Sequence, residues 1–279
     1  DDLKELIDGC YDVAFLCLHG ALGEDGRIQG FLETIGLPYT CSGVWSSATC
    51  IDKSKAKTFY EKHGIPTPEA IVLAPEEVDD YARAATKITE TLGSKVAVKA
   101  STEGSSIGVY IVDTPEQIAT ALETELAQGN AVVVERYVKG REFTCVVLGS
   151  GAAAQALPVI EIIPRNESYD FESKYAAGGC VHVCPAELTD EQAATIQRYA
   201  VMAQNALECD GAARTDFLMD EDGGVWALET NTVPGMTATS LLPDAAAAAG
   251  ISFPELCTIM VQMAFDRPSL RDASARASF

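Results

Sequence analysis

The segment 211–241, GAARTDFLMDEDGGVWALETNTVPGMTATSL, constrains the fold most, because it sets two β-type runs around a tight turn. Asp-Gly-Gly between two such runs is typical of a β-hairpin. In a hairpin, Asp216 on the first strand can face Glu229 and Asn231 on the second. Glu229 and Asn231 are two residues apart, so they project from one face. The sequence therefore predicts three oxygen donors gathered on one side of a hairpin.

These three donors predict a metal site. Oxygen-only ligands suit a hard cation that also holds substrate phosphates, which means Mg²⁺ or Mn²⁺. A solvated hairpin with scattered acids is the weaker interpretation, because Glu229 directly follows the apolar run 225–228 and an unpaired buried carboxylate would be costly. Arg214 shares the face of Asp216. A metal needs no cation beside it, so Arg214 indicates an anion in the same site.

Charge and composition limit the partners. The chain of 279 residues has a formal charge of −21 from 41 acidic and 20 basic residues, which disfavours nucleic acid and anionic membranes. An anionic nucleotide must then be held by local Lys, Arg and Mg²⁺. The sequence contains no run of 18 apolar residues, so no membrane span is predicted. Nine cysteines without paired metal-type spacing indicate reduced thiols in a cytoplasmic protein.

The N-terminal part predicts alternating helices and strands. After a helix at 2–10, the apolar run 11–18 predicts a buried parallel strand. A Gly-rich loop with His19 follows, in the position where α/β proteins bind ligands. Glu24 or Asp25 in this loop fits a helix cap equally well. A helix at 26–36, a strand and turn at 37–43 and a helix opened by Asp52-Lys53 are expected next.

The middle of the chain predicts a nucleotide site. Lys99 stands near the end of a strand that leads into the loop EGSSIG, and such a Gly/Ser loop can cover a triphosphate. The loop joins two strands, so it is not a Walker loop, which would run into a helix. The apolar run 131–134 before Glu135 fits an adenine slot. For Glu142, across the next turn, a solvated edge strand is a fair competitor.

The C-terminal part predicts further elements around the hairpin. The polar segment 165–179, with Lys174-Tyr175, predicts a mobile functional loop. A long helix capped by Thr189 should precede the hairpin. A short helix after Ser240 would offer free N–H groups to a carboxylate. A closing helix and a polar tail end the chain.

Taken in order, these motifs resemble those of the ATP-grasp ligases, and specifically the D-alanine–D-alanine ligases, over residues 11 to about 260. The motifs are HGALGEDGRIQG, a strand lysine before EGSSIGV, VERYVKGRE, SKY, ARTDF and LETNTVPGMTATSLLP. The resemblance implies an α/β (α+β) ATP-grasp fold with a remnant of an N-terminal α/β (pre-ATP-grasp) domain. The implied divisions are 1–45, 46–138 and 139–279, with ATP between the last two.

The resemblance also implies the reaction. Two D-alanines and one ATP give D-alanyl-D-alanine through an acyl phosphate, for peptidoglycan precursor synthesis in the cytoplasm. ATP is a substrate, two Mg²⁺ or Mn²⁺ ions are the cofactors, and the enzyme is a homodimer. No nucleic acid or membrane takes part.

Site residues are implied position by position. The ligands of two magnesium ions are Asp216, Glu229 and Asn231, and the ATP contacts are Lys53, Lys99, Lys174, Glu135, Arg136, Val138 and Glu142. The acyl phosphate and the oxyanion are stabilised by Arg214 and the N–H of Gly235. Ser240 and Leu241 take the carboxylate of the second D-alanine. Ser105 and Tyr175 close a loop, and His19 lies near the first D-alanine.

Two departures from the family pattern leave alternatives open. The family begins with a strand whose glutamate holds the first D-alanine, and nothing before Asp1 supplies it, so we expect that an N-terminal segment is missing. An inactive nucleotide-binding fragment is therefore one alternative. In addition, Lys99-Ala100 replaces the usual Lys-Pro. D-serine or D-lactate are alternative acceptors, although Tyr175 argues against lactate. PGMTATSLLP makes another ATP-grasp carboxylate–amine ligase the weaker alternative.

Overall fold

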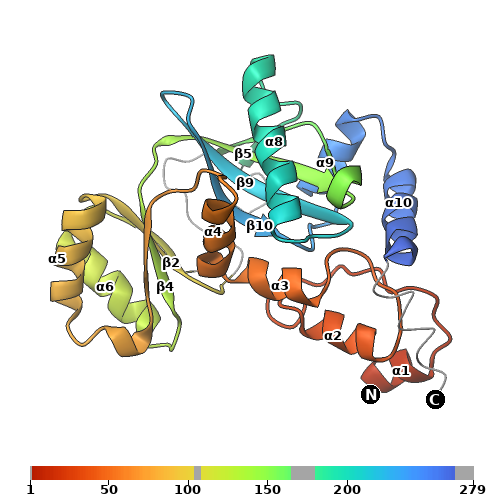
Figure 1. Ribbon diagram of the computed structural model, residues 1–279, viewed down its shortest axis with the longest axis horizontal. Coiled ribbons are helices and arrows are strands. Elements are labelled where there is room, and N and C mark those ends of the chain that lie inside the picture. Colours follow the sequence, from red (N-terminus) through yellow and green to blue (C-terminus); the bar gives the residue numbers. More distant parts are fainter. Residues whose placement is uncertain (1, 104–107, 165–179, 268–279) are drawn as a thin grey trace.

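The computed structural model describes residues 2–103, 108–164 and 180–267, which form two antiparallel β-sheets with helices packed on them (Figure 1). The helices are α1 Asp2–Asp8, α2 Arg27–Thr34, α3 Val44–Ile51, α4 Lys53–Lys62, α5 Tyr81–Leu92, α6 Pro115–Leu126, α8 Asp190–Ala206, α9 Leu241–Ala248 and α10 Phe253–Asp266. The strands are β1 Ala70–Leu73, β2 Val96–Ala100, β3 Val109–Val112, β4 Val132–Arg136, β5 Gly140–Leu148, β6 Gln155–Ala156, β7 Ile160–Pro164, β8 Cys180–Val183, β9 Ala212–Asp220 and β10 Val225–Asn231.

The smaller sheet has the order β1-β4-β2-β3, and α5 and α6 cover one of its faces. Alternate residues of the two central strands point toward these helices, as the period of a strand requires. Val96 and Val98 of β2 and Val134 of β4 are fully buried against Ile88 of α5 and Leu122 of α6. This unit has its own hydrophobic core.

The larger sheet has the order β10-β9-β5-β7-β8, with β6 added beside β5. On one face, Phe143 and Phe217 pack against α4 and α8, to which Tyr60 and Ile196 belong. On the other face, side chains of β5 and β9 pack against α9, α10 and the N-terminal residues, in a core that includes Val146, Leu148, Ala212, Leu242, Leu256 and Tyr39. Helices therefore cover both sides of this sheet.

Helix α4 joins the two units. Asp52 caps it, because its carboxylate accepts from the N–H groups of Ser54 and Lys55 and from the hydroxyl of Ser101, which follows β2. The N–H of Lys53 donates to the carbonyl of Ser101 at 2.9 Å. One end of α4 is thus tied to the small sheet while its buried face, with Tyr60, packs on the large sheet.

The structure corrects the expected N-terminal strands. Residues 11–18 and 37–43 form no strand and meet only in one parallel bridge between Ala14 and Tyr39. Leu16 is buried, but Leu18 is half exposed. Among the described residues no further strand extends the bridge into a ladder, so the prediction of a buried parallel strand was wrong.

Other expected elements are confirmed. Thr114 caps α6, and Thr189 caps α8 in a capping box with Gln192. The strands β9 and β10 form the predicted hairpin. The strands β4 and β5 follow each other along the chain but belong to different sheets. The limits 1–45, 46–138 and 139–279 stay a prediction, and Ala56 and Tyr60 of the middle segment pack with the large sheet.

Within the described residues, no single helix has the length and apolar character needed to cross a membrane; α9 and α10, bent by 106°, pass that test only as a pair.

Candidate active site between the two sheets

A bulge in β10 sets the geometry of the hairpin. Ala227 lies opposite Phe217, but the register shifts at the next residue, so that Glu229 lies opposite Asp216 and Asn231 opposite Arg214. The extra residue is Leu228, and a bulge of this kind re-aims the side chains that follow it. The four polar residues named in the sequence are therefore neighbours on one face, as predicted.

Asp216 is held firmly on that face. Its carboxylate accepts two bonds from the guanidinium of Arg214, Nε to Oδ1 at 2.9 Å and Nη2 to Oδ2 at 3.0 Å. The hydroxyl of Thr144 on β5 donates to Oδ1 at 2.6 Å. Asp216 is only 5% exposed, so these partners compensate for the loss of water. The sequence predicts an anionic partner for Arg214; in the structure its guanidinium binds the carboxylate of Asp216.

The opposite face of the hairpin is anchored to α4. The hydroxyl of Tyr60 is 2.7 Å from that of Thr230, which is 2.8 Å from the hydroxyl of Thr215. All three side chains are buried. This hydroxyl chain fixes the hairpin against the helix that carries Lys53.

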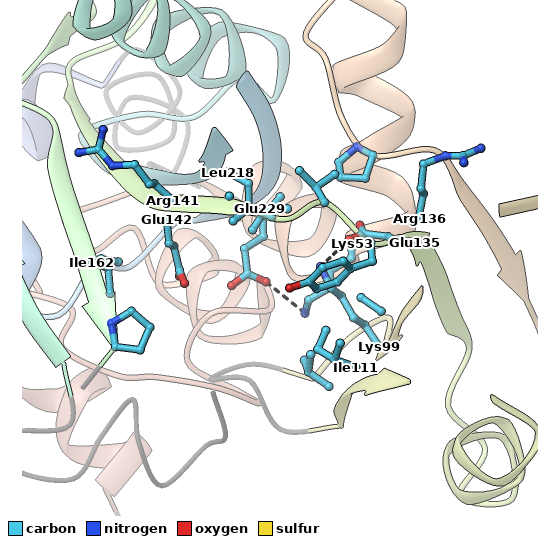
Figure 2. Close-up of a pocket in the computed structure, with 18 of the residues that line it drawn as sticks. Lys53, Lys99, Ile111, Glu135, Arg136, Arg141, Glu142, Ile162, Leu218 and Glu229 are labelled. Atoms are coloured by element: carbon cyan, nitrogen blue, oxygen red, sulfur yellow. Dashed lines mark hydrogen bonds and ion pairs between the residues drawn. The ribbon is translucent and has the colours of Figure 1, made fainter. Parts of the chain in front are cut away.

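A cavity of about 770 Å³ opens between the two sheets (Figure 2). Seven of the predicted site residues line it, namely Lys53, Lys99, Glu135, Arg136, Val138, Glu142 and Glu229. The apolar part of the wall includes Ile111 of β3, Ile162 of β7 and Leu218 of β9. An elongated ligand with one apolar and one anionic end would fit such a lining.

Lys53 lies where the two units meet. Its ammonium donates to the carbonyl of Glu103 at 2.6 Å and lies 3.4 Å from a carboxylate oxygen of Glu229. Figure 2 shows this contact across the cavity. Glu103 begins the Gly/Ser loop, so Lys53 connects that loop to the hairpin.

Lys99 and Glu135 form a second pair, and a third residue joins them. Glu135 Oε2 accepts from Lys99 Nζ at 2.5 Å, and Glu135 Oε1 accepts from Lys57 Nζ at 2.9 Å. Burial raises the pKa of Glu135, but Lys99 and Lys57 outweigh burial and lower the pKa below its ordinary value. The carboxylate of Glu135 thus already binds two ammonium groups, and its predicted contact with adenine stays a prediction.

The sequence interpretation missed Lys57. Burial lowers its pKa, and the attraction of Glu135 offsets only part of this change. One signal could have found it: Lys57 follows Lys53 by four residues on a helix, which places both on neighbouring turns of one face.

The two arginines of the lining point away from the cavity (Figure 2). Arg136 donates to Glu69 at 2.5 Å. Arg141 binds Glu161 with two bonds of 2.7 Å. The cations that point into the cavity, among the residues described, are therefore Lys53 and Lys99.

The predicted residues for the second substrate lie together after the hairpin. Ser240 precedes α9, and its hydroxyl accepts from the N–H of Thr237 at 3.0 Å. A Cβ at position 235 would lie 2.7 Å from that hydroxyl, so Gly235 permits this close turn. Leu241 opens α9. These residues are outside the lining of the cavity.

The N-terminal loop is held by its own acidic side chains, and a ligand role for it stays a prediction. His19 lies 3.3 Å from Glu24, which also accepts from the N–H of Gly20 at 2.8 Å. Asp25 accepts from the N–H of Arg27, the first residue of α2. His19 is not in the cavity lining. Ser105, Lys174 and Tyr175 lie outside the described residues, as does the expected mobile loop 165–179.

Comparison with known families agrees with this geometry. Residues 59–262 match the family described as D-ala D-ala ligase C-terminus, and residues 4–42 match D-ala D-ala ligase N-terminus. The D-alanine--D-alanine ligase of Desulforamulus reducens is 44% identical over 269 residues, covering 95% of this chain and 86% of that protein. The one from Halalkalibacterium halodurans is 40% identical over 268 residues, with 96% and 86% covered.

Solved structures give the same result. The D-alanine--D-alanine ligase from Bacillus anthracis has a TM-score of 0.82 at 35% identity, covering 99% of this chain and 85% of that one. Its complex with ATP has a TM-score of 0.79 at 32% identity, with the same coverage.

Two sheets around a nucleotide-sized cavity, with lysines from one side and a hairpin carboxylate from the other, define an ATP-grasp enzyme. The chain belongs to the D-alanine–D-alanine ligase family. The predictions of fold, family and enzyme class are confirmed, and the family is one that binds ATP.

Proposed function

We propose that this chain joins two D-alanines at the expense of ATP, through an acyl phosphate, with the reaction centred on the hairpin face. The observation that carries the proposal is the position of Glu229, which lies opposite Asp216 and 3.4 Å from Lys53 at the wall of the cavity. Identity of 40–45% to relatives named as D-alanine--D-alanine ligases supports it.

ATP would lie between the sheets with its base among the apolar side chains. Lys53 and Lys99 would hold the phosphates, because they are the described cations that point into the cavity. Glu142 would take the ribose hydroxyls, while the backbone near Arg136 and Val138 borders the base. Lys174 is assigned to the transferred phosphate from the family resemblance alone.

The hairpin donors fit a divalent cation. No cluster of three or more His, Cys, Asp or Glu side chains is arranged for a metal among the described residues, but the proposed set is two carboxylates and the amide of Asn231. Oxygen donors on facing positions match the preference of Mg²⁺ or Mn²⁺. Two such ions, held by Asp216, Glu229 and Asn231, would neutralise phosphate charge when bound.

The remaining roles concern the chemical step and the substrates. Arg214 and the N–H of Gly235 would stabilise charge on the acyl phosphate and on the tetrahedral oxygen. The turn at Ser240 and Leu241 would receive the carboxylate of the second D-alanine at the N-terminus of α9. His19 is assigned to the neighbourhood of the first D-alanine. Ser105 and Tyr175 are assigned to loop closure.

The test is product analysis with competing acceptors. Purified protein is incubated with ATP, Mg²⁺ and D-alanine, alone or with D-serine or D-lactate, and ADP and dipeptide are quantified. We expect equal amounts of ADP and D-alanyl-D-alanine, with little mixed product. A predominant D-alanyl-D-serine product would favour the second candidate acceptor, and ADP without any ligated product would contradict the ligase. A homodimer, implied by the family, is checked by sedimentation.

A further inference from the structure

The lysine that the sequence interpretation missed is among the most deeply buried charges in the described structure. The side chain of Lys57 is 4% exposed and that of its partner Glu135 is 3% exposed. Lys99, on the far side of the same carboxylate, is 12% exposed and lines the cavity. Three charged groups in a row therefore lead from the buried face of α4 to the wall of the cavity.

Burying this row of charges costs desolvation energy, so its presence calls for a reason. A buried ion pair contributes little net stability, and apolar side chains of similar volume often serve as well. Glu135 already has Lys99 as a partner, so the fold alone does not require a second cation there. The extra charge lies behind a wall of the cavity, where it can act on a bound ligand.

The charge balance of the cavity indicates that effect. Four basic and four acidic side chains line it, which sums to no net charge. Arg136 and Arg141 point outward to acids, which leaves Lys53 and Lys99 near Glu135, Glu142 and Glu229. An anionic nucleotide entering this lining would therefore meet two ammonium groups and three carboxylates. Lys57, which lies behind the wall, adds a third ammonium group and offsets the charge of Glu135.

We propose that Lys57 is a positioning residue for nucleotide binding: its ammonium neutralises Glu135, so that the charge of Lys99 is available to the phosphates of ATP. This inference rests on the proposed function, in which Lys99 meets those phosphates. Without Lys57, Glu135 and Lys99 would form a neutral pair. With it, the group of three carries one net positive charge beside the cavity.

Lys57 also takes part in a hydrogen-bonded link to β10, and the effect of this link must be separated from the effect of its charge. Its ammonium donates to Thr67 Oγ1 at 2.7 Å, and that hydroxyl donates to the carbonyl of Ala227 on β10 at 2.8 Å. Thr67→Val removes this link and leaves all three charges in place. It is therefore the matched control for a merely structural role.

The experiment measures binding of the non-hydrolysable analogue β,γ-imido-ATP with Mg²⁺ by calorimetry, using the whole chain. Lys57→Met should weaken binding about tenfold or more, because one unit charge near the phosphates is lost. Lys57→Met combined with Glu135→Gln restores the net charge of the group and should recover most of that loss. Thr67→Val should bind within about twofold of wild type.

Two results would overturn the proposal: unchanged nucleotide binding by Lys57→Met, or a double variant that binds as weakly as Lys57→Met alone. If Lys57→Met fails to fold in thermal denaturation, Lys57→Gln, which keeps a polar group at this position, carries the test: it should bind about tenfold more weakly than wild type, and binding within about twofold of wild type would refute the charge argument. A wild-type chain that does not bind the analogue would instead contradict the proposed function itself.

Discussion

Glu229 of β10 lies directly opposite Asp216 of β9 because β10 bulges at Leu228. In an unbroken ladder Leu228 would take that position, and Glu229 would point with Thr215 toward α4. The bulge moves Glu229 and Asn231 to the face of Asp216 and Arg214. One extra residue thus assembles the polar face on which the proposed chemistry depends.

Replacing Glu229 by Gln should abolish ATP turnover and leave the fold intact. The substitution keeps the size of the side chain but removes the negative charge that would hold the metal. Release of ADP in the presence of D-alanine measures the effect, and thermal denaturation reports the fold. Glu221→Gln in the exposed hairpin turn is the matched control, because Glu221 pairs with the surface residue Lys139 and lies away from the proposed metal site. Wild-type turnover that survives strong chelation would contradict the metal assignment.

Arg214→Ala should lower kcat by about 10²–10³ with a modest change in the KM for ATP, because the lost cation acts where charge develops in the reaction. Lysine at this position should rescue little, since it lacks the planar fork that matches a phosphate group. A raised KM for ATP with kcat near wild type would make Arg214 an ordinary phosphate anchor.

The contact between Arg214 and Asp216 allows a second measurement on the same variant. If Arg214 acts on the chemical step, the affinity for Mn²⁺, followed by electron paramagnetic resonance, should stay close to that of wild type. A large loss of Mn²⁺ affinity in Arg214→Ala would instead mean that its main role is to orient Asp216.

Asp52→Ala should lower the free energy of unfolding by about 0.5–2 kcal/mol, because α4 loses the side chain that caps it. Asp52→Asn is the matched control, since Asn caps helices nearly as well as Asp. Chemical denaturation at pH 7 measures both. Equal stability of Asp52→Ala and wild type would contradict the role of this cap.

The same pair predicts a pH dependence. Burial raises the pKa of Asp52, but hydrogen bonds from Ser101, Ser54 and the N–H of Lys55 lower it below the ordinary value. A carboxyl whose pKa is depressed in the folded state stabilises the protein above the pKa of the unfolded chain, about 3.9, and loses that contribution as the pH falls through the folded pKa. The stability difference between wild type and Asp52→Asn should therefore shrink on acidification below about pH 4. A stability difference that grows below about pH 4 would contradict the lowered pKa of Asp52 in the folded state.

Local patterns predicted the hairpin, the capped helices and the strand that carries Lys99, because turn residues, caps and alternation are properties of short segments. Local patterns gave a wrong prediction at 11–18, where the apolar run forms a single parallel bridge between Ala14 and Tyr39 instead of a strand. Whether such a run becomes a strand depends on its neighbours in space. Sequence pattern carries no such information for a single chain.

The candidate site shows the same division. The residues Asp216, Glu229 and Lys99 stand in recognisable motifs, whereas Lys57 acts through partners that are distant in sequence: Glu135 is 78 residues away. The bulge at Leu228 was equally hidden, because an apolar residue in a strand gives no local signal of a shifted register.

The metal and phosphate positions are tested most directly by a crystal structure with β,γ-imido-ATP and Mn²⁺, in which the anomalous signal of manganese locates the ions. We expect peaks within coordination distance of Asp216, Glu229 and Asn231, with the phosphates between Lys53 and Lys99. Nucleotide bound in the cavity with no manganese peak at the hairpin, or phosphates that lie away from both lysines, would contradict the proposed positions of the metal ions and of ATP.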